Sequence, residues 1–348
     1  MTLTKNLYGI TKDGKEVYSY IIRNKNGAYI ELVSYGATLN KIVVPDKDGV
    51  FRDVLVGFDT MEGQEICTDS QGRTVGRVAN RIAGKGVTID GRNYQITKNV
   101  DGLFTLHGNH EYETAVWDSE ILSDDSVKFS YFSPEGAEGF PGSVKNEVIF
   151  SFDDNNAVKI EYYAVPSEKC PLNLTNHAYF NLNGFDAGTV LGHYLKLYCD
   201  AYTPTDEKAI PTGEIRPVEN TAFDFRNGKT IGQDVSVPDE QLIIGRGYDH
   251  NFQITGYDGT LRRFAESVGD ISKIKMEAYT DLPGVQLYIG NFMNGTQTGK
   301  AGLPLEYRTG FCLETQYFPD AVNHSEFIQN IFSPDRPFKS TTVYLFTI

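Results

Sequence analysis

Residues 144–165 read VKNEVIFSFDDNNAVKIEYYAV, and this stretch decides the fold. Alternate positions are mostly apolar in residues 144–152 and again in residues 158–162, whereas residues 153–156 between them are all polar. Alternation with a period of two is the side-chain pattern of a β-strand, and a polar run of Asp and Asn is typical of a turn. The stretch therefore predicts a β-hairpin with one buried face.

The same period recurs along the chain. Residues 87–96 read VTIDGRNYQI, in which Asp90 and Gly91 suit the tight turn of a second hairpin. Further strands are expected at residues 28–33, 127–132, 273–279, 285–291, 311–314 and 342–347. Long helical periods are missing, and only short helical turns are expected, at residues 62–66 and 320–331. No linker or repeat divides the chain, so we expect one all-β domain over residues 1–348, a large antiparallel β-sandwich with few short helices.

The composition supports this class and disfavours several partners. The 21 Tyr, 21 Phe, 34 Gly and 14 Pro suit strands joined by many turns. The net charge of −14 disfavours nucleic acid and anionic membrane surfaces. No apolar run approaches the roughly 18 residues of a membrane span. The four cysteines form no CxxC pair and the first residues lack a hydrophobic signal region, so we expect reduced thiols and a cytoplasmic protein.

Histidines are the first candidates for chemistry, because the chain has only six of them. Three lie in conspicuous surroundings, in the stretches TLHGN at 105–109, NLTNHAYFNL at 173–182 and YDHNF at 248–252. A lone histidine is more often a hydrogen-bonded structural residue than a catalyst. His177 has the richest polar context, and alternation would place it with Tyr179 and Asn181 on one face of a strand.

Metal and nucleotide sites are poorly supported. His107 and His110 have HxxH spacing, but a zinc site needs more ligands and no helical pattern surrounds them. The stretch from Gly84 to Gly86 begins like a dinucleotide-binding loop, yet Ile89 stands at the third glycine position and a hairpin follows. We therefore expect neither a metal ion nor a cofactor.

Two carboxylates complete the set of candidates. Glu314 follows the apolar run GFCL, where a carboxylate is costly unless it is paired or faces a cleft. A carboxylate and a histidine together suffice for general acid–base catalysis. Asp249 and Glu314 could instead be the carboxylate pair of a glycosidase.

Short motifs in a fixed order give the chain a family resemblance. They are SYGATL at 34–39, GRVANRI at 76–82, LHG at 106–108, EGFPG at 138–142, NLTNHAYFNL at 173–182, IPTGE at 210–214, FDFR at 223–226, YDH at 248–250, PGVQ at 283–286, CLETQ at 312–316 and PDA at 319–321. In these motifs the chain resembles the aldose 1-epimerases, also called galactose mutarotases. One departure is the stretch SPDRP at 333–337, where a Pro-Gly-Glu turn is usual. The resemblance implies a β-sandwich isomerase that interconverts the α and β anomers of free aldoses such as galactose and glucose without a cofactor.

The resemblance also implies roles for single residues. The Glu of CLETQ, Glu314, is the implied base, and the His of NHAYFNL, His177, is the implied acid. The His of LHG, His107, would bind the sugar near its ring oxygen. Further implied sugar contacts are Asn80, Arg81, Asp249 and Gln286. Tyr179 and Phe292 are candidates for aromatic contacts with the sugar carbons. His110 lies outside the LHG motif, so we expect it to be dispensable.

Mutarotation sets the protonation states that these groups need. The ring opens when the C1 hydroxyl loses a proton and the ring oxygen gains one. A carboxylate, with an ordinary pKa of about 4.3, is a base at neutral pH, and a histidine near 6.5 is an acid if a neighbouring negative charge raises its pKa. The reaction therefore needs Glu314 ionised and His177 protonated.

Three other functions stay open at this point, one of which is the glycosidase with Asp249 and Glu314 as its carboxylate pair. A sugar-phosphate 1-epimerase would need extra cations, and Arg77 lies close to Arg81 in the sequence. A non-catalytic sugar-binding domain would not need Glu314 or His177, although both are present. The expected partner is a monosaccharide, and the expected oligomeric state is a monomer or a weak homodimer.

Overall fold

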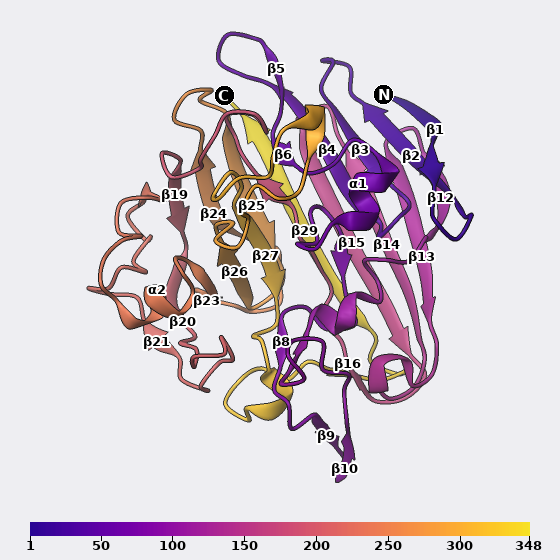
Figure 1. Ribbon diagram of the computed structural model, residues 1–348, viewed down its shortest axis with the longest axis vertical. Coiled ribbons are helices and arrows are strands. Elements are labelled where there is room, and N and C mark those ends of the chain that lie inside the picture. Colours follow the sequence, from indigo (N-terminus) through magenta and orange to yellow (C-terminus); the bar gives the residue numbers. More distant parts are fainter.

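A computed structural model describes residues 1–348 and shows antiparallel sheets packed in layers (Figure 1). The largest sheet has nine strands, in the order β12 (Asp118–Ser123), β13 (Ser126–Ser133), β14 (Val144–Phe152), β15 (Ala157–Pro166), β29 (Phe338–Thr347), β25 (Lys275–Thr280), β24 (Arg262–Val268), β19 (Tyr194–Leu197) and β22 (Lys229–Thr230). An N-terminal sheet has five strands, in the order β1 (Thr2–Ile10), β2 (Glu16–Arg23), β3 (Tyr29–Val33), β4 (Thr38–Pro45) and β5 (Phe51–Asp53). These sheets confirm the predicted all-β class.

A second five-stranded sheet lies against the largest one. Its order is β21 (Arg216–Pro217), β20 (Cys199–Tyr202), β23 (Asp249–Ile254), β26 (Gly284–Tyr288) and β27 (Cys312–Gln316). Five strand pairs complete the fold: β8 (Arg81–Ile82) with β11 (Thr105–Leu106), β9 (Val87–Ile89) with β10 (Arg92–Tyr94), β7 (Thr74–Val75) with β17 (Thr175–Asn176), β6 (Leu55–Val56) with β18 (Tyr179–Phe180), and β16 (Cys170–Pro171) with β28 (Ile331–Phe332).

Both hairpins predicted from the sequence are confirmed. Strands β14 and β15 pair antiparallel, and their buried positions alternate as the sequence predicts. The turn between them is closed by the Asp153 carboxylate, which accepts hydrogen bonds from the backbone of Asn155 and Ala157. The turn between β9 and β10 places Asp90 and Gly91 at positive φ angles of 49° and 79°, as a tight hairpin turn requires.

The helices agree only partly with the sequence. Helix α1 (Met61–Ile66) confirms the predicted helical turn, and the Thr60 side chain caps its N-terminus. Helix α2 (Glu240–Ile244) was not predicted. Of the short helical turns expected within residues 320–331, one forms, the 3₁₀ turn η4 (Ala321–Asn323), and the rest of the segment is irregular. No helix of the structure has the length and apolar character needed to cross a membrane.

Strand β27 has two faces with different tasks. On one face, Leu313 belongs to the main hydrophobic core and its carbonyl accepts a hydrogen bond from the Tyr344 hydroxyl of β29. Thr315 on the same face hydrogen-bonds Thr342 of β29. Because side chains alternate along a strand, Glu314 points to the opposite face, away from β29. The packing of the two sheets thus turns Glu314 towards the cavity described next.

Candidate active site

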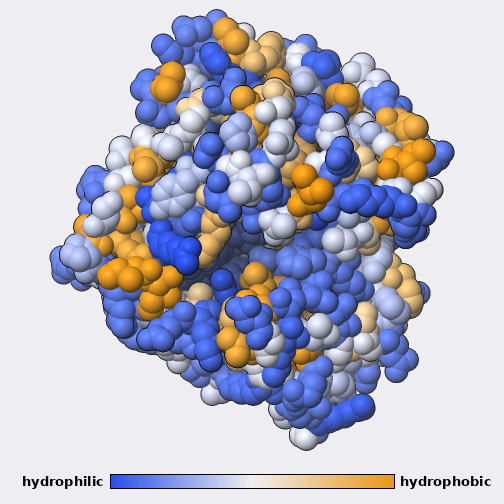
Figure 2. Space-filling model, in the orientation of Figure 1, coloured by the Kyte–Doolittle hydropathy of each residue, from blue (hydrophilic) through white to orange (hydrophobic).

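The candidate site is a cavity of about 280 Å³ that opens near the centre of one face (Figure 2). Its walls are formed by Thr68, Asp69, Ser70, Asn80, Arg81, Leu106, His107, His110, His177, Tyr179, Asp249, Tyr288, Phe292 and Glu314. The structure therefore brings together every site residue predicted from the sequence except Gln286. Segments that are more than two hundred residues apart in the chain meet here.

Three adjacent strands supply one wall through their register. Asp249 of β23 lies opposite Tyr288 of β26, and Gln286 of β26 lies opposite Glu314 of β27. Paired residues on neighbouring strands project to the same side of a sheet. The register thus places a row of polar side chains on the face of this sheet that lines the cavity.

His177 lies between the short strands β17 and β18, rather than within the continuous strand that its sequence suggested. Its ring stacks on Tyr179, with centroids 5.0 Å apart, so these two residues do share a face as predicted. Asn181 does not share it, because its amide donates hydrogen bonds to the carbonyls of Gly188 and Thr309 away from the cavity. Nδ1 of His177 lies 3.5 Å from Sγ of Cys312, and Nε2 lies 3.6 Å from Oε1 of Glu314.

Burial controls the charges of this pair. It raises the pKa of the Glu314 carboxyl well above its usual range, an effect that Asp249 strengthens and Arg81 opposes. Burial lowers the pKa of the His177 imidazole, an effect that Glu113 opposes. The carboxylate and imidazolium expected from the sequence are therefore the less favoured charge states in the free protein. The neutral pair and the ion pair nevertheless hold the same number of protons. They differ only in whether the one titratable proton lies on the carboxyl of Glu314 or on the imidazole of His177.

His107 is held as a neutral hydrogen-bond donor. Burial lowers its pKa well below the usual range, and the backbone N–H of Asn80 donates to its Nδ1 at 3.2 Å. A neutral imidazole whose Nδ1 accepts a hydrogen bond must carry its proton on Nε2. The Nε2–H group is thus the one that His107 can offer to a ligand.

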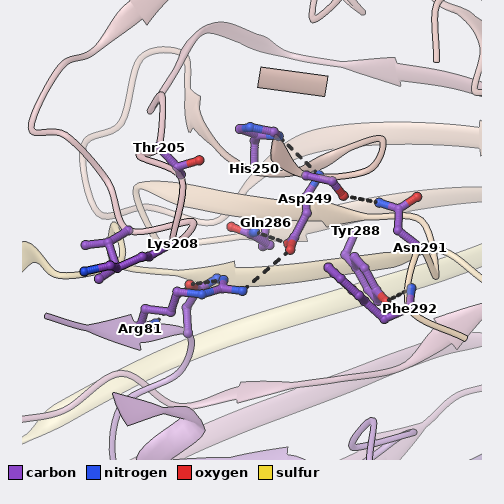
Figure 3. A network of polar contacts seen from close by, with 12 residues as sticks. Arg81, Thr205, Lys208, Asp249, His250, Gln286, Tyr288, Asn291 and Phe292 are labelled. Atoms are coloured by element: carbon purple, nitrogen blue, oxygen red, sulfur yellow. Dashed lines mark hydrogen bonds and ion pairs between the residues drawn. The ribbon is translucent and has the colours of Figure 1, made fainter. Parts of the chain in front are cut away.

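Asp249 is positioned by residues on two sides (Figure 3). Nε2 of Gln286 donates to its Oδ1 at 2.7 Å, and the Arg81 guanidinium lies 3.9 Å from its Oδ2. Gln316 in turn donates to the side-chain oxygens of Gln286 and Asn251. Gln286 therefore lies behind Asp249 rather than in the cavity wall. The Asn80 side chain has a similar task, because its Oδ1 accepts hydrogen bonds from the backbone and guanidinium of Arg81.

Arg77, the candidate cation for a phosphate, is fully buried away from the cavity. Its guanidinium donates to the Ser133 hydroxyl and to the backbone carbonyls of Pro134, Pro141 and Gly142. These partners occupy the guanidinium, so Arg77 has no role in ligand binding.

One group of side chains has the geometry to hold a metal ion. The ligand atoms of His107, His177 and Glu314 lie within 4.8 Å of one another. Of the HxxH pair, only His107 belongs to this group, because Nδ1 of His110 bonds the Glu113 carboxylate. Any metal ion would therefore occupy the proposed catalytic position itself.

Several residues of the cavity were not identified from the sequence. Tyr288 could have been found, because it follows Gln286 at the spacing that puts both on one face of a strand. Asp69 and Ser70 could not, since they come from a loop whose path depends on distant contacts. His110, which the sequence analysis considered only as half of an HxxH pair and expected to be dispensable, also lines the cavity.

Comparisons with known proteins agree along nearly the whole chain. A family model described as Aldose 1-epimerase matches residues 18–345. Galactose mutarotase from Bos taurus is 39% identical over 321 residues, which are 92% of this chain and 91% of the relative. Aldose 1-epimerase from Escherichia coli K12 is 33% identical over 97% of both chains. The solved structure of a GalM/aldose epimerase homologue from C. elegans has a TM-score of 0.85 at 32% identity and covers 94% of this chain and 98% of that one.

Proposed function

The chain belongs to the aldose 1-epimerase family and interconverts the α and β anomers of free aldoses, and we propose that it does so in the cavity between Glu314 and His177. The observation that carries this proposal is the pair itself, a carboxyl and an imidazole 3.6 Å apart in the wall of a cavity of about 280 Å³. Galactose and glucose are the substrates we propose.

The two groups divide the proton transfers. Glu314, as the carboxylate, takes the proton of the C1 hydroxyl while His177 delivers a proton to the ring oxygen. The bond between C1 and the ring oxygen breaks, C1 becomes an aldehyde carbon, and the ring oxygen becomes a hydroxyl. Rotation about the C1–C2 bond and closure with the roles exchanged give the other anomer. Each proton transfer is worth roughly 10²–10⁴-fold in rate.

The active charge state needs one internal proton transfer. The pair shares one proton, and moving it from Glu314 to His177 produces the required carboxylate and imidazolium. Arg81 favours this shift because its charge lowers the pKa of Glu314. The hydroxyls of a bound sugar add hydrogen bonds to the carboxylate, which favours its charged form further.

The remaining residues hold the sugar. The Nε2–H of His107 donates to the ring oxygen region, and Asp249 accepts from hydroxyl groups that Arg81 also contacts. Tyr179, Tyr288 and Phe292 offer ring faces and edges to the carbon skeleton. Asn80 and Gln286 act through Arg81 and Asp249, whose side chains they position.

The acidic lining favours neutral sugars over sugar phosphates. Asp69 and Asp249 line the cavity, and Arg81 is already engaged by Asp249. A phosphate group placed beside these carboxylates would meet like charges. This arrangement, together with the buried position of Arg77, supports the free aldose as the substrate.

The proposal extends to the state of the protein in the cell. We treat residues 1–348 as one domain, because a single core cluster includes Tyr20 near one end and Phe346 near the other. All four cysteines are free thiols, which suits the cytoplasm. A monomer or a weak homodimer is the proposed oligomeric state, which sedimentation of the purified protein would measure.

Polarimetry tests the function directly. Freshly dissolved α-D-galactose and α-D-glucose should approach their equilibrium rotation much faster with the protein than in buffer alone. A protein that binds galactose but leaves the buffer rate unchanged would be a sugar-binding domain instead.

A further inference from the structure

His110 and Glu113 form a second polar pair in the cavity, and the mechanism above does not use it. His110 lines the cavity with about a third of its side chain exposed, whereas the Glu113 carboxylate behind it is almost fully buried. Nδ1 of His110 bonds Oε2 of Glu113. Because Nδ1 is engaged, Nε2 is the ring nitrogen that can serve a ligand.

The backbone that carries His110 adopts an uncommon conformation. The 3₁₀ turn η1 (His107–His110) has positive φ angles throughout, including 53° at His107, 58° at Asn109 and 60° at His110. Gly108 is required within it, because an added Cβ would meet the Gly76 carbonyl oxygen at 2.4 Å. Left-handed backbone costs L-residues roughly 1–2 kcal/mol each. Such strain persists where the surrounding structure needs it, often at functional sites.

This turn places two histidines side by side. Residues three apart lie on the same side of a turn with three residues per revolution. The rings of His107 and His110 accordingly lie with their centroids 6.2 Å apart, and both line the cavity. The strained turn therefore brings His110 to the position next to a proposed sugar contact.

Glu113 sets the charge of His110. Burial alone would raise the pKa of Glu113, but its bond to His110 and the neighbouring histidines lower it to about 2, so it stays a carboxylate. The hydrogen bond that Nδ1–H of His110 donates to the Glu113 carboxylate raises the pKa of His110. The Glu113 carboxylate thus favours the protonated form of His110, in which Nε2 carries a proton beside the neutral His107.

We propose that His110, held by the buried Glu113 carboxylate, binds a hydroxyl group of the aldose through its Nε2–H. This assignment rests on the proposed function and names a substrate contact that lies outside the family motifs found in the sequence, in place of the expectation that His110 is dispensable. His110 donates to a hydroxyl next to the oxygen that His107 contacts. It binds the sugar in the ground state and in the transition state alike, so it acts on KM rather than on kcat.

The charge of His110 makes binding depend on pH. The ionisable groups that face it are Glu113 from its own loop, Arg73 from the segment before β7, and, around the cavity, His107, His177 and Asp69. Glu113 favours the imidazolium and Arg73 opposes it. As pH rises through the raised pKa of His110, the charged donor is lost and KM should increase.

The test uses a pair of neutral substitutions. Single removal of His110 would leave a buried carboxylate without its partner, so the double variant His110→Gln/Glu113→Gln removes both charges and retains the volume. Its KM for D-galactose should rise about 10-fold at neutral pH, as expected for the loss of a charged hydrogen bond, with kcat within about twofold of the wild type. A folded double variant with the wild-type KM at every pH would overturn the proposal.

A single variant separates the effect of the charge on His110 from the effect of its contact with the sugar. In Glu113→Gln, His110 keeps its position but loses the charge that favours its protonation, so the increase of KM with pH should begin at a lower pH than in the wild type. Glu111→Gln is the matched control from the same loop, because its carboxylate accepts from Tyr131 outside the cavity. An equal effect of the Glu111 and Glu113 substitutions would overturn the proposal.

Calorimetric titration with D-galactose distinguishes this proposal from the proposed function. The affinities of wild type and double variant can be compared even if the protein does not accelerate mutarotation, which would refute only the function. A tenfold weaker affinity of the double variant supports the role of His110. No galactose binding by the wild type would overturn both.

Discussion

Nε2 of His177 lies 3.6 Å from Oε1 of Glu314, and both side chains are almost fully buried. The second carboxylate oxygen of Glu314, Oε2, has no hydrogen-bond partner within the protein. A buried polar atom without a partner is costly, which suggests that a ligand supplies the partner. The pair is thus arranged for two proton transfers at the expense of folding stability.

Replacing His177 should remove the acid. His177→Asn keeps a polar side chain but carries no titratable proton, so kcat should fall by about 10²-fold or more. The affinity for galactose should change much less. A variant that retains the wild-type kcat would remove His177 from the mechanism.

The pH dependence of kcat/KM should report a pair that holds one proton in the free protein. In acid, a second proton neutralises Glu314 while His177 is charged, and in alkali the last proton leaves, so kcat/KM should fall on both sides. Because burial lowers the pKa of His177, the acidic limb should lie below the ordinary histidine value of 6.5. The apparent pKa values belong to the coupled pair. A kcat/KM that keeps rising into alkali would show that no proton of the pair is needed.

Replacing Glu314 should stabilise the fold, and more so at high pH. The pKa of Glu314 is higher in the folded protein than in the unfolded chain. The favourable contribution of its protonated form to folding is therefore fully present below the unfolded pKa and is lost as pH rises through the folded pKa. Gln cannot titrate and avoids this loss. The free energy of urea-induced unfolding should be measured for Glu314→Gln and for the wild type. The difference, Glu314→Gln minus wild type, should increase from pH 4.5 to pH 9. A difference that decreases over this range would contradict the assigned shift.

Gln286 should act through Asp249 rather than on the sugar. Gln286→Leu removes the 2.7 Å hydrogen bond to Oδ1 of Asp249 and should raise KM about tenfold, with little change in kcat. Asp249→Leu combined with Gln286→Leu should be no worse than Asp249→Leu alone, because the contact that Gln286 supports is already gone. Additive losses would indicate an independent sugar contact.

Local patterns predicted the fold well where neighbouring residues decide the structure. The alternation in residues 144–165 is a property of adjacent side chains, and the hairpin formed as expected. The turn after residue 320 shows the limit. Asp320 has a positive φ of 57°, and its carboxylate accepts from the backbone of Ala83, 237 positions away. This long-range contact holds the loop in an irregular conformation, and no pattern in the neighbouring residues predicts the contact.

The candidate site was predicted from family motifs, whereas its charges required the structure. The sequence shows that Glu314 and His177 exist but not that burial opposes the charge on each of them. Likewise, the relation of Gln286 to Asp249 depends on the register of β23 against β26. The left-handed turn at His107–His110, which brings His110 into the cavity, has only Gly108 as a local signal.

The most direct test of the account is the mutarotation rate of Glu314→Gln, measured by polarimetry with α-D-galactose at saturating concentration. The substitution keeps the size of the side chain and removes the base. We predict a fall in kcat of about 10²-fold or more, while calorimetry shows that galactose still binds. A Glu314→Gln protein that turns over galactose at the wild-type rate would contradict the central claim.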